Sequence, residues 1–252
     1  EFSAYRAYTQ GDNLRYIDWK VWGRTDEFYV KQFEDDTNLR CQIFLDTSAS
    51  MDFGDGEANK FHYGRVLAAV LAELMVRQHD APGLIVFGEQ ARQAVPTQAS
   101  RHHADEIFQL LTQAQAGGGT KIDERLFRIV ETFSRRGLAV VISDFFTANQ
   151  AVLELLRQLN GQRQEVVVFH VLAPEELDLP YEGEYIFEDS ETAEELPVHA
   201  DDFRTEYQRR LSEFCEQIKQ ECIQLETDYQ LLRTDAPLDT ALIAYLERRA
   251  AV

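Results

Sequence analysis

Three oxygen-bearing side chains, Asp46, Ser48 and Ser50, form a D-x-S-x-S pattern. The pattern closes an apolar run at 41–46 that is too short for a helix and is typical of a buried strand. One carboxylate and two hydroxyls, spaced by two residues in a turning loop, can point into a common volume. All-oxygen ligation suits a hard cation such as Mg²⁺, which keeps several waters and takes few protein carboxylates. The pattern therefore predicts a divalent-metal site, for Mg²⁺ or alternatively Mn²⁺ or Ca²⁺.

Two further oxygen ligands are candidates from elsewhere in the chain. Thr120 follows three consecutive glycines at 117–119, whose backbone freedom permits a close approach. Asp144 ends the apolar run 138–143 just as Asp46 ends its own. Ligands of open α/β sheets bind at the carboxyl ends of the strands. The two aspartates are therefore expected to stand side by side if their strands are neighbours.

The elements that must position these residues alternate between apolar runs and amphipathic stretches from about residue 39 onward. This alternation predicts a three-layer α/β/α fold, with a Rossmann-like, mostly parallel sheet of six strands and helices on both faces. A weaker run at 91–95 closely follows the strand at 83–87 and is expected to form an antiparallel edge strand. The five stronger strands are expected at 41–46, 83–87, 138–143, 165–172 and 228–232, and the clearest helix at 202–224.

Residues 1–38 differ from the rest, because they are crowded with aromatic and charged side chains without a long period of either kind. We expect a segment that wraps the domain and ends in a strand at 27–33. The main domain would then span residues 39–252 and end in a helix at about 238–249. An acidic stretch within it predicts a small hairpin insertion at about 184–198.

The formal net charge of −19 restricts the class of partner. A chain this acidic repels a phosphate backbone, and no Lys/Arg cluster offsets the charge locally, so nucleic acid is not an expected partner. No apolar run approaches the ~18 residues of a membrane span. The three cysteines show no metal-binding spacing, and their odd number argues against a disulfide framework. These features predict a cytoplasmic protein without a membrane span in this chain.

The five candidate ligands together resemble the metal-ion-dependent adhesion site of von Willebrand factor A domains. The segment before them resembles the hallmark of the bacterial domain of unknown function 58 family, and the likeness spans nearly the whole chain. The family pattern usually has alanine where this chain has Gly23, which is a minor departure. The residues that carry the second likeness are Gly11-Asp12, Arg15, Ile17-Asp18-Trp19, Arg24 and Tyr29-Val30-Lys31-Gln32-Phe33-Glu34.

The resemblance implies a non-catalytic, metal-dependent interaction module. Ser48 and Ser50 would ligate the metal directly, and Thr120 would do so directly or through water. Asp46 and Asp144 would hold bound waters or switch to direct contact. One coordination position would stay open for an acidic side chain of a protein partner. Because members of this family are commonly encoded beside MoxR-type AAA+ ATPases, such an ATPase is the expected partner, with the domain as its adaptor.

Other interpretations of the same residues remain open. Ser48 or Ser50 could simply cap the next helix. Asp46 could be the nucleophile of a Mg²⁺-dependent phosphohydrolase of the haloacid-dehalogenase type. Such enzymes, however, need a D-x-D sequence, no lysine stands in a matching motif, and no base is obvious near Asp46. A zinc site is not expected, because the histidines are scattered and no HExxH motif is present.

Overall fold

The chain forms two compact units, Glu1–Asn38 and Leu39–Val252, in the computed structural model. The described residues are 2–7, 9, 18–25, 27–33, 39–88, 92–118, 124–133, 135–146, 149–188, 195–239 and 242.

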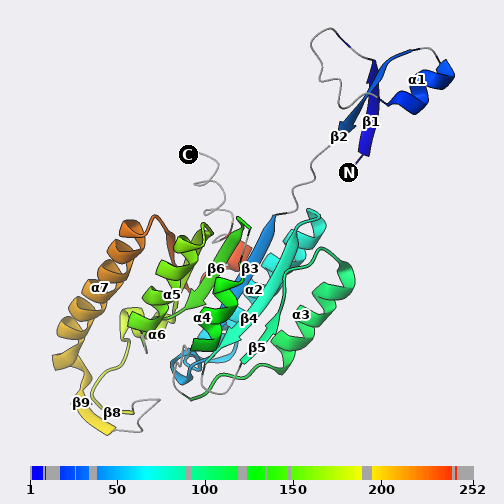
Figure 1. Ribbon diagram of the computed structural model, residues 1–252. Helices are drawn as coiled ribbons and strands as arrows, with labels where there is room; N and C mark the ends of the chain where they lie inside the picture. Colours follow the sequence, from blue (N-terminus) through cyan, green and yellow to red (C-terminus); the bar gives the residue numbers. More distant parts are fainter. Residues whose placement is uncertain are drawn as a thin grey trace. The chain divides into compact units, whose positions relative to one another are not determined.

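The larger unit is built on a six-stranded sheet that is parallel except at one edge (Figure 1). The edge strand β5 runs antiparallel to β4, whereas the other neighbouring strands pair in parallel. The predicted mostly parallel α/β sheet and its antiparallel edge strand are both confirmed. Across the sheet the strands are β10 (Asp228–Arg233), β7 (Glu165–Leu172), β6 (Leu138–Ser143), β3 (Arg40–Asp46), β4 (Ala81–Phe87) and β5 (Arg92–Val95).

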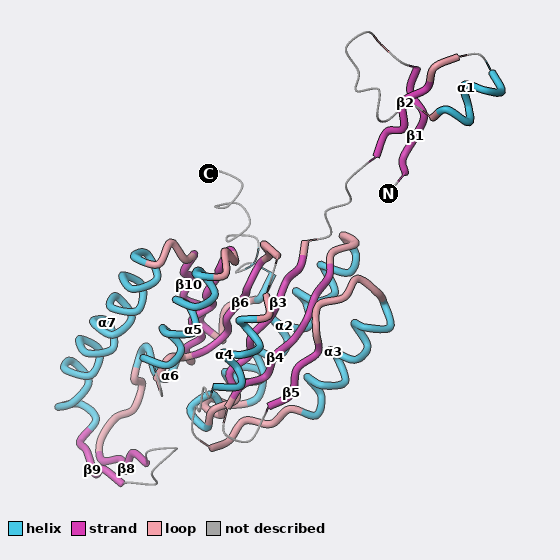
Figure 2. The backbone as a smooth tube through the Cα atoms, viewed as in Figure 1, coloured by secondary structure: helices cyan, strands magenta, loops and turns pink. Residues whose placement is uncertain are grey.

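Helices cover both faces of this sheet, as Figures 1 and 2 show. One face packs against α2 (Lys60–Arg77) and α3 (Arg101–Gln113). The other face packs against α4 (Glu124–Glu131), α5 (Asn149–Gly161) and α7 (Ala200–Gln224). The shorter elements are the 3₁₀ helices η2 (Ala49–Met51) and η3 (Gly56–Ala58), helix α6 (Pro174–Asp178), and the antiparallel hairpin of β8 (Glu184–Glu188) and β9 (Glu195–His199).

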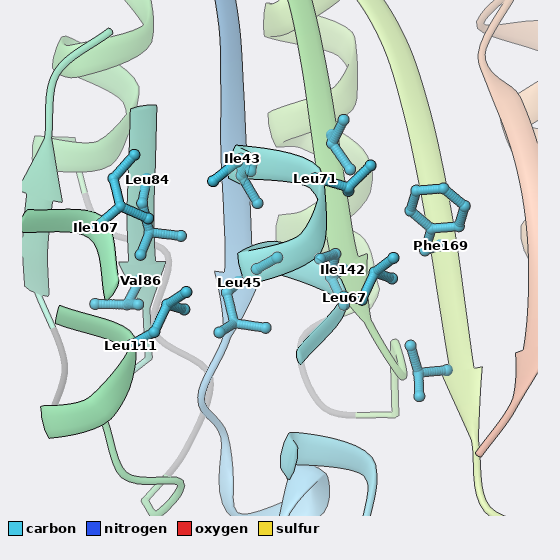
Figure 3. Close-up of a cluster of buried hydrophobic side chains, with 14 of the residues drawn as sticks. Ile43, Leu45, Leu67, Leu71, Leu84, Val86, Ile107, Leu111, Ile142 and Phe169 are labelled. Atoms are coloured by element: carbon cyan, nitrogen blue, oxygen red, sulfur yellow. The ribbon is translucent and has the colours of Figure 1, made fainter. Parts of the chain in front are cut away.

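The central strands carry apolar side chains on both faces because both faces are covered. On β3, Ile43 and Leu45 point into the core beneath α2 and α3, whereas Phe44 belongs to the core on the other face. Figure 3 shows the first of these cores, where Ile43 and Leu45 lie with Leu67 of α2 and Ile142 of β6. Burying each such side chain stabilises the fold by about 1.5–3 kcal/mol. The two cores therefore hold the ends of β3 and β6 in fixed positions.

In the smaller unit, the described residues form a strand pair and a helix. Strand β1 (Phe2–Ala7) pairs antiparallel with β2 (Tyr29–Phe33), and α1 (Trp19–Thr25) precedes β2. The predicted strand at 27–33 is confirmed as β2, while β1 and α1 were not predicted. The expected wrapping of this segment on the main domain stays a prediction. Most of the helix expected at about 238–249 lies outside the described residues.

Candidate metal centre

The carboxyl edge of the parallel sheet brings together side chains from three neighbouring strands. Asp46 is the last residue of β3, and Asp144 directly follows β6, which pairs with β3 in parallel. Glu176 lies on α6, just after the next strand, β7. The structure thus places both predicted aspartates at one edge, together with a third carboxylate that the sequence analysis did not single out.

Asp46 is completely buried, and both of its carboxylate oxygens are occupied. Oδ1 accepts a hydrogen bond from the backbone N–H of Ser48 at 2.9 Å, and Oδ2 accepts one from the Ser143 hydroxyl at 2.6 Å. The pKa of Asp46 is raised to about 7, first by burial and then by the nearby charge of Asp144, while the hydrogen bonds from Ser143 and Ser48 oppose the rise. A bound cation would relieve both effects, because it would stabilise the ionised carboxylate.

The two serines form a chain of oxygen atoms that ends at Asp144. Ser48 Oγ lies 3.0 Å from Ser50 Oγ, and the Ser50 hydroxyl donates to Asp144 Oδ1 at 3.2 Å. Ser48 is the N-cap residue of η2 but makes no side-chain capping hydrogen bond. Helix capping therefore does not explain the Ser48 hydroxyl, which is directed to its neighbours at the sheet edge.

The glycine-rich loop before Thr120 lies against the D-x-S-x-S segment. The Gly117 N–H donates to the Thr47 carbonyl at 2.9 Å, and the Ala49 N–H donates to the Gly118 carbonyl at 2.8 Å. Gly118 has a φ of 71°, a left-handed conformation that glycine adopts without strain. Thr120 itself lies outside the described residues, so its predicted role as a ligand stays a prediction.

A lysine that the sequence analysis overlooked lies inside this cluster. Lys60, the first residue of α2, is completely buried, and its Nζ is 2.7 Å from Asp144 Oδ2 and 2.6 Å from Glu176 Oε1. The ammonium also lies over the ring of Phe146, 4.7 Å from its centroid. Glu176 Oε2 accepts from the Ala173 N–H at 2.8 Å. Burial raises the pKa of Glu176, and the charge of Lys60 opposes this shift.

The turn after β6 is held in a strained conformation. Phe145 has a φ of 59°, which is uncommon for a bulky residue, and its N–H donates to Ser143 Oγ at 3.0 Å. His170 of β7 supports the same turn, because its Nε2 lies 3.0 Å from the Asp144 carbonyl oxygen. The backbone around Asp144 is therefore fixed from two sides.

The donor set fits a small hard cation. In an octahedral Mg²⁺ site with bonds of about 2.1 Å, neighbouring oxygens are about 3.0 Å apart. The Ser48 Oγ to Ser50 Oγ distance of 3.0 Å matches this value. Among the described residues, no group of three or more His, Cys, Asp or Glu side chains is arranged to hold a metal. A metal at this edge would thus depend on hydroxyl ligands, which suits Mg²⁺ better than zinc.

Comparison with solved structures supports the fold. BatB, a conserved hypothetical protein of Bacteroides thetaiotaomicron, superimposes with a TM-score of 0.54 at 17% identity, over 85% of this chain and 100% of that one. An aerotolerance-related membrane protein of Bacteroides fragilis gives a TM-score of 0.52 with the same identity and coverage. Identity this low shows the fold alone. In the described part of this chain, no helix is long and apolar enough to cross a membrane.

Sequence comparison places the chain in a family. Uncharacterized proteins of Mycobacterium bovis and Mycobacterium tuberculosis are 30% identical to it over 192 residues. The match covers 74% of this chain but only 59% of each relative's length. Residues 4–216 match the family described as "Protein of unknown function DUF58". The chain therefore belongs to the DUF58 family, and its fold is a three-layer α/β/α arrangement around a mostly parallel sheet.

Proposed function

We propose that this chain is a metal-dependent protein-interaction module and not an enzyme. The observation that carries the proposal is the line of oxygens from Ser48 through Ser50 to Asp144, at the sheet edge where α/β proteins bind ligands. Mg²⁺ would be held by Ser48, Ser50 and Thr120, with Asp46 and Asp144 holding its waters.

The burial of Asp46 argues against the alternative of a Mg²⁺-dependent phosphohydrolase. A nucleophilic carboxylate needs an oxygen that can approach the phosphorus atom. Both oxygens of Asp46 already accept hydrogen bonds, and the residue has no exposed surface. Lys60 does supply a lysine that the sequence argument had missed, but it contacts Asp144 and Glu176. The geometry therefore favours binding over phosphoryl transfer.

The ion, when bound, would supply a positive pole with one coordination position open to a partner's carboxylate. The serine hydroxyls contribute no net charge, so an ion held by them stays attractive to an anion. Without the ion, an incoming carboxylate would approach an edge beneath which Asp46 and Asp144 are buried, with Lys60 balancing Asp144, on a chain whose net charge is −19. Like-charge repulsion at that edge would oppose docking. Metal binding would thus convert a repulsive surface into an attachment point.

Two partly exposed aromatic rings frame the site. Phe53 is 38% exposed and Phe146 is 36% exposed, and both rings lie beside the Lys60 ammonium. Aromatic side chains at the centre of an interface commonly supply much of its binding energy. They would pack against the partner around its metal-bound carboxylate. The partner we propose is a MoxR-type AAA+ ATPase, which places the interaction in the cytoplasm, where ATP is available.

The test compares Ser48→Ala with Thr47→Val. Ser48→Ala removes one predicted ligand, whereas Thr47→Val removes the adjacent hydroxyl, which donates to the Phe87 carbonyl instead. Calorimetric titration with MnCl₂ should give binding heat for the wild type and Thr47→Val and none for Ser48→Ala. The immobilised wild type should then capture a purified MoxR-type ATPase in Mg²⁺ and release it in EDTA. Equal Mn²⁺ binding by all three proteins would refute the metal site, and capture by Ser48→Ala in EDTA would refute the metal bridge.

A further inference from the structure

The Lys60 ammonium has no contact with water, although lysine is almost never fully buried unless it is paired. Two of its three N–H groups point to the carboxylates of Asp144 and Glu176. Its remaining surroundings include the ring faces of Phe53 and Phe146, at 5.6 and 4.7 Å from their centroids. The positive charge is therefore held in one place.

Helix α2 is built to hold the lysine at this depth. Asn59 caps the helix, because its side chain accepts from the His62 N–H at 2.9 Å. Gly64, one turn after Lys60, lies so close to the sheet that a Cβ there would sit 3.2 Å from Ile142 Cγ2 and Leu45 Cδ1. A glycine at this position lets the first turn approach the ends of β3 and β6.

Helix stability alone does not explain this placement. A cation in the first turn opposes the helix dipole, which favours anions there. Buried ion pairs also contribute little net stability, because desolvation cancels most of the attraction. The burial of Lys60 is thus better explained by its electrostatic effect on neighbouring groups than by a contribution to the stability of the fold.

The neighbour most affected is Asp144. Its Oδ2 is taken by Lys60, and its Oδ1 accepts from the Ser50 hydroxyl and from the Phe146 N–H. A metal on Oδ1 would have to displace one of these donors, and a metal on Oδ2 would lie beside the Lys60 ammonium. Its negative charge is also already balanced by the ammonium 2.7 Å away.

We infer that Lys60, anchored by Glu176, is a resident counter-cation that keeps Asp144 from direct contact with the metal and so holds the metal affinity low. This inference rests on the proposed function, because it concerns the same metal site. An ion that Asp144 does not neutralise retains more positive charge for a partner's carboxylate. The Lys60 ammonium would thereby lower the affinity of the site for the metal and favour binding of a partner's carboxylate to the bound ion.

The test removes the buried pair without changing the net charge. In the double variant Lys60→Met/Glu176→Gln, the glutamine oxygen can still accept from the Ala173 N–H. The matched control, Lys219→Met/Glu216→Gln, makes the same exchanges at an exposed pair on α7, whose N–O distance is 3.3 Å. Mn²⁺ affinity is measured by calorimetry, and the number of waters on bound Mn²⁺ by water-proton relaxation. Thermal unfolding checks that each variant is folded.

We expect the double variant to bind Mn²⁺ more tightly, on the order of tenfold, because a unit positive charge near the ion is removed. Asp144 should then replace one water on the ion, while the control matches the wild type. The single variant Glu176→Gln keeps the ammonium but loses its second carboxylate, so it should bind Mn²⁺ several-fold more weakly than the wild type.

Each other outcome overturns the inference in a distinguishable way. A folded double variant with unchanged or weaker Mn²⁺ affinity overturns the role of Lys60 and leaves the metal site standing. If the double variant does not fold, the single variant Glu176→Gln decides. Mn²⁺ affinity equal to that of the wild type would then overturn the role of Lys60 and leave the metal site standing. Absence of Mn²⁺ binding in every protein, the wild type included, overturns the proposed metal site and this inference with it.

Discussion

Replacing His170 with glutamine should change how the stability of the fold depends on pH. His170 is completely buried on β7, with Nε2 facing the Asp144 carbonyl oxygen and Nδ1 2.7 Å from the Tyr229 hydroxyl. A carbonyl oxygen can only accept, so Nε2 carries the hydrogen and the neutral ring accepts from Tyr229 at Nδ1. The pKa of His170 is lowered to about 4, chiefly by burial and also by the charge of Lys60, while the charge and carbonyl of Asp144 partly oppose the shift.

The sign and size of the effect follow from this lowered pKa. As pH falls below the ordinary histidine pKa of about 6.5, His170 becomes protonated in the unfolded chain. In the folded chain it stays neutral until about pH 4. The stability associated with neutral His170 is therefore present above pH 6.5 and is lost as pH falls towards 4. A difference of about 2.5 pKa units, at about 1.4 kcal/mol per unit, amounts to about 3 kcal/mol once pH 4 is reached.

Asp46 has the opposite effect on the free energy of unfolding over much of the same pH range. Its pKa is raised to about 7, so the folded chain takes up that proton first and gains stability as pH falls. The stability curve of the wild type alone therefore mixes the two groups. The difference between a His170 variant and the wild type isolates the histidine.

The assay is urea unfolding of the wild type and His170→Gln at several pH values from 7.5 to 4. Glutamine can donate to the Asp144 carbonyl and accept from Tyr229 without titrating, so the fold should persist. The free energy of unfolding of the variant, relative to the wild type, should rise by about 3 kcal/mol as pH falls to 4. His102→Gln, at a histidine of α3 whose side chain is 88% exposed, is measured in the same way as a control for the substitution. A difference for His170→Gln that does not change with pH would refute the reasoning.

Two further predictions concern packing, and both are measured as free energies of unfolding in urea. Gly137→Ala should destabilise the fold by about 1–3 kcal/mol, because the new Cβ would lie 2.7 Å from the Arg40 carbonyl oxygen. Its control, Gly161→Ala, has no atom within 4 Å of the new methyl and should be neutral or slightly stabilising. Leu67→Ala should cost about 2–5 kcal/mol because its side chain is fully buried, whereas Val66→Ala on the exposed side of α2 should cost under about 0.5 kcal/mol. Equal costs within either pair would contradict the packing described for that site.

Much of the sheet could be predicted because its strands are local features. A strand covered on both faces needs a short run of apolar side chains, as in β7 at residues 165–172, and such a run is visible without knowing its neighbours. Strand β1 is different. Its residues alternate aromatic, small and charged side chains, and its only described partner, β2, lies more than twenty residues further along the chain. Pairing over that distance leaves no short-range pattern to read.

The residues of the candidate metal centre also differ in whether local sequence predicts them. Asp46, Ser48 and Ser50 are close in sequence, and Asp144 is recognisable because it ends an apolar strand as Asp46 does. Lys60 has no such mark, since a lysine at a helix start is normally exposed, and only tertiary packing buries this one. Glu176 is harder to single out than Asp144, because it lies on α6 beyond the end of β7 at Leu172 and directly follows Glu175.

That third strand-end carboxylate changes how the edge should be understood. With Asp46 and Asp144 alone, the site has two negative charges, and a divalent ion would neutralise both. The structure adds Glu176 and Lys60, whose charges cancel, and the ammonium lies 2.7 Å from Asp144 Oδ2 and 2.6 Å from Glu176 Oε1. Because the ammonium contacts Asp144 directly, we propose that the pair weakens metal binding although it adds no net charge. The ligand motif therefore predicts which ion the carboxyl edge of the sheet could bind. The affinity for that ion would depend on buried charges, such as Lys60, that only the tertiary fold brings close to the ligands.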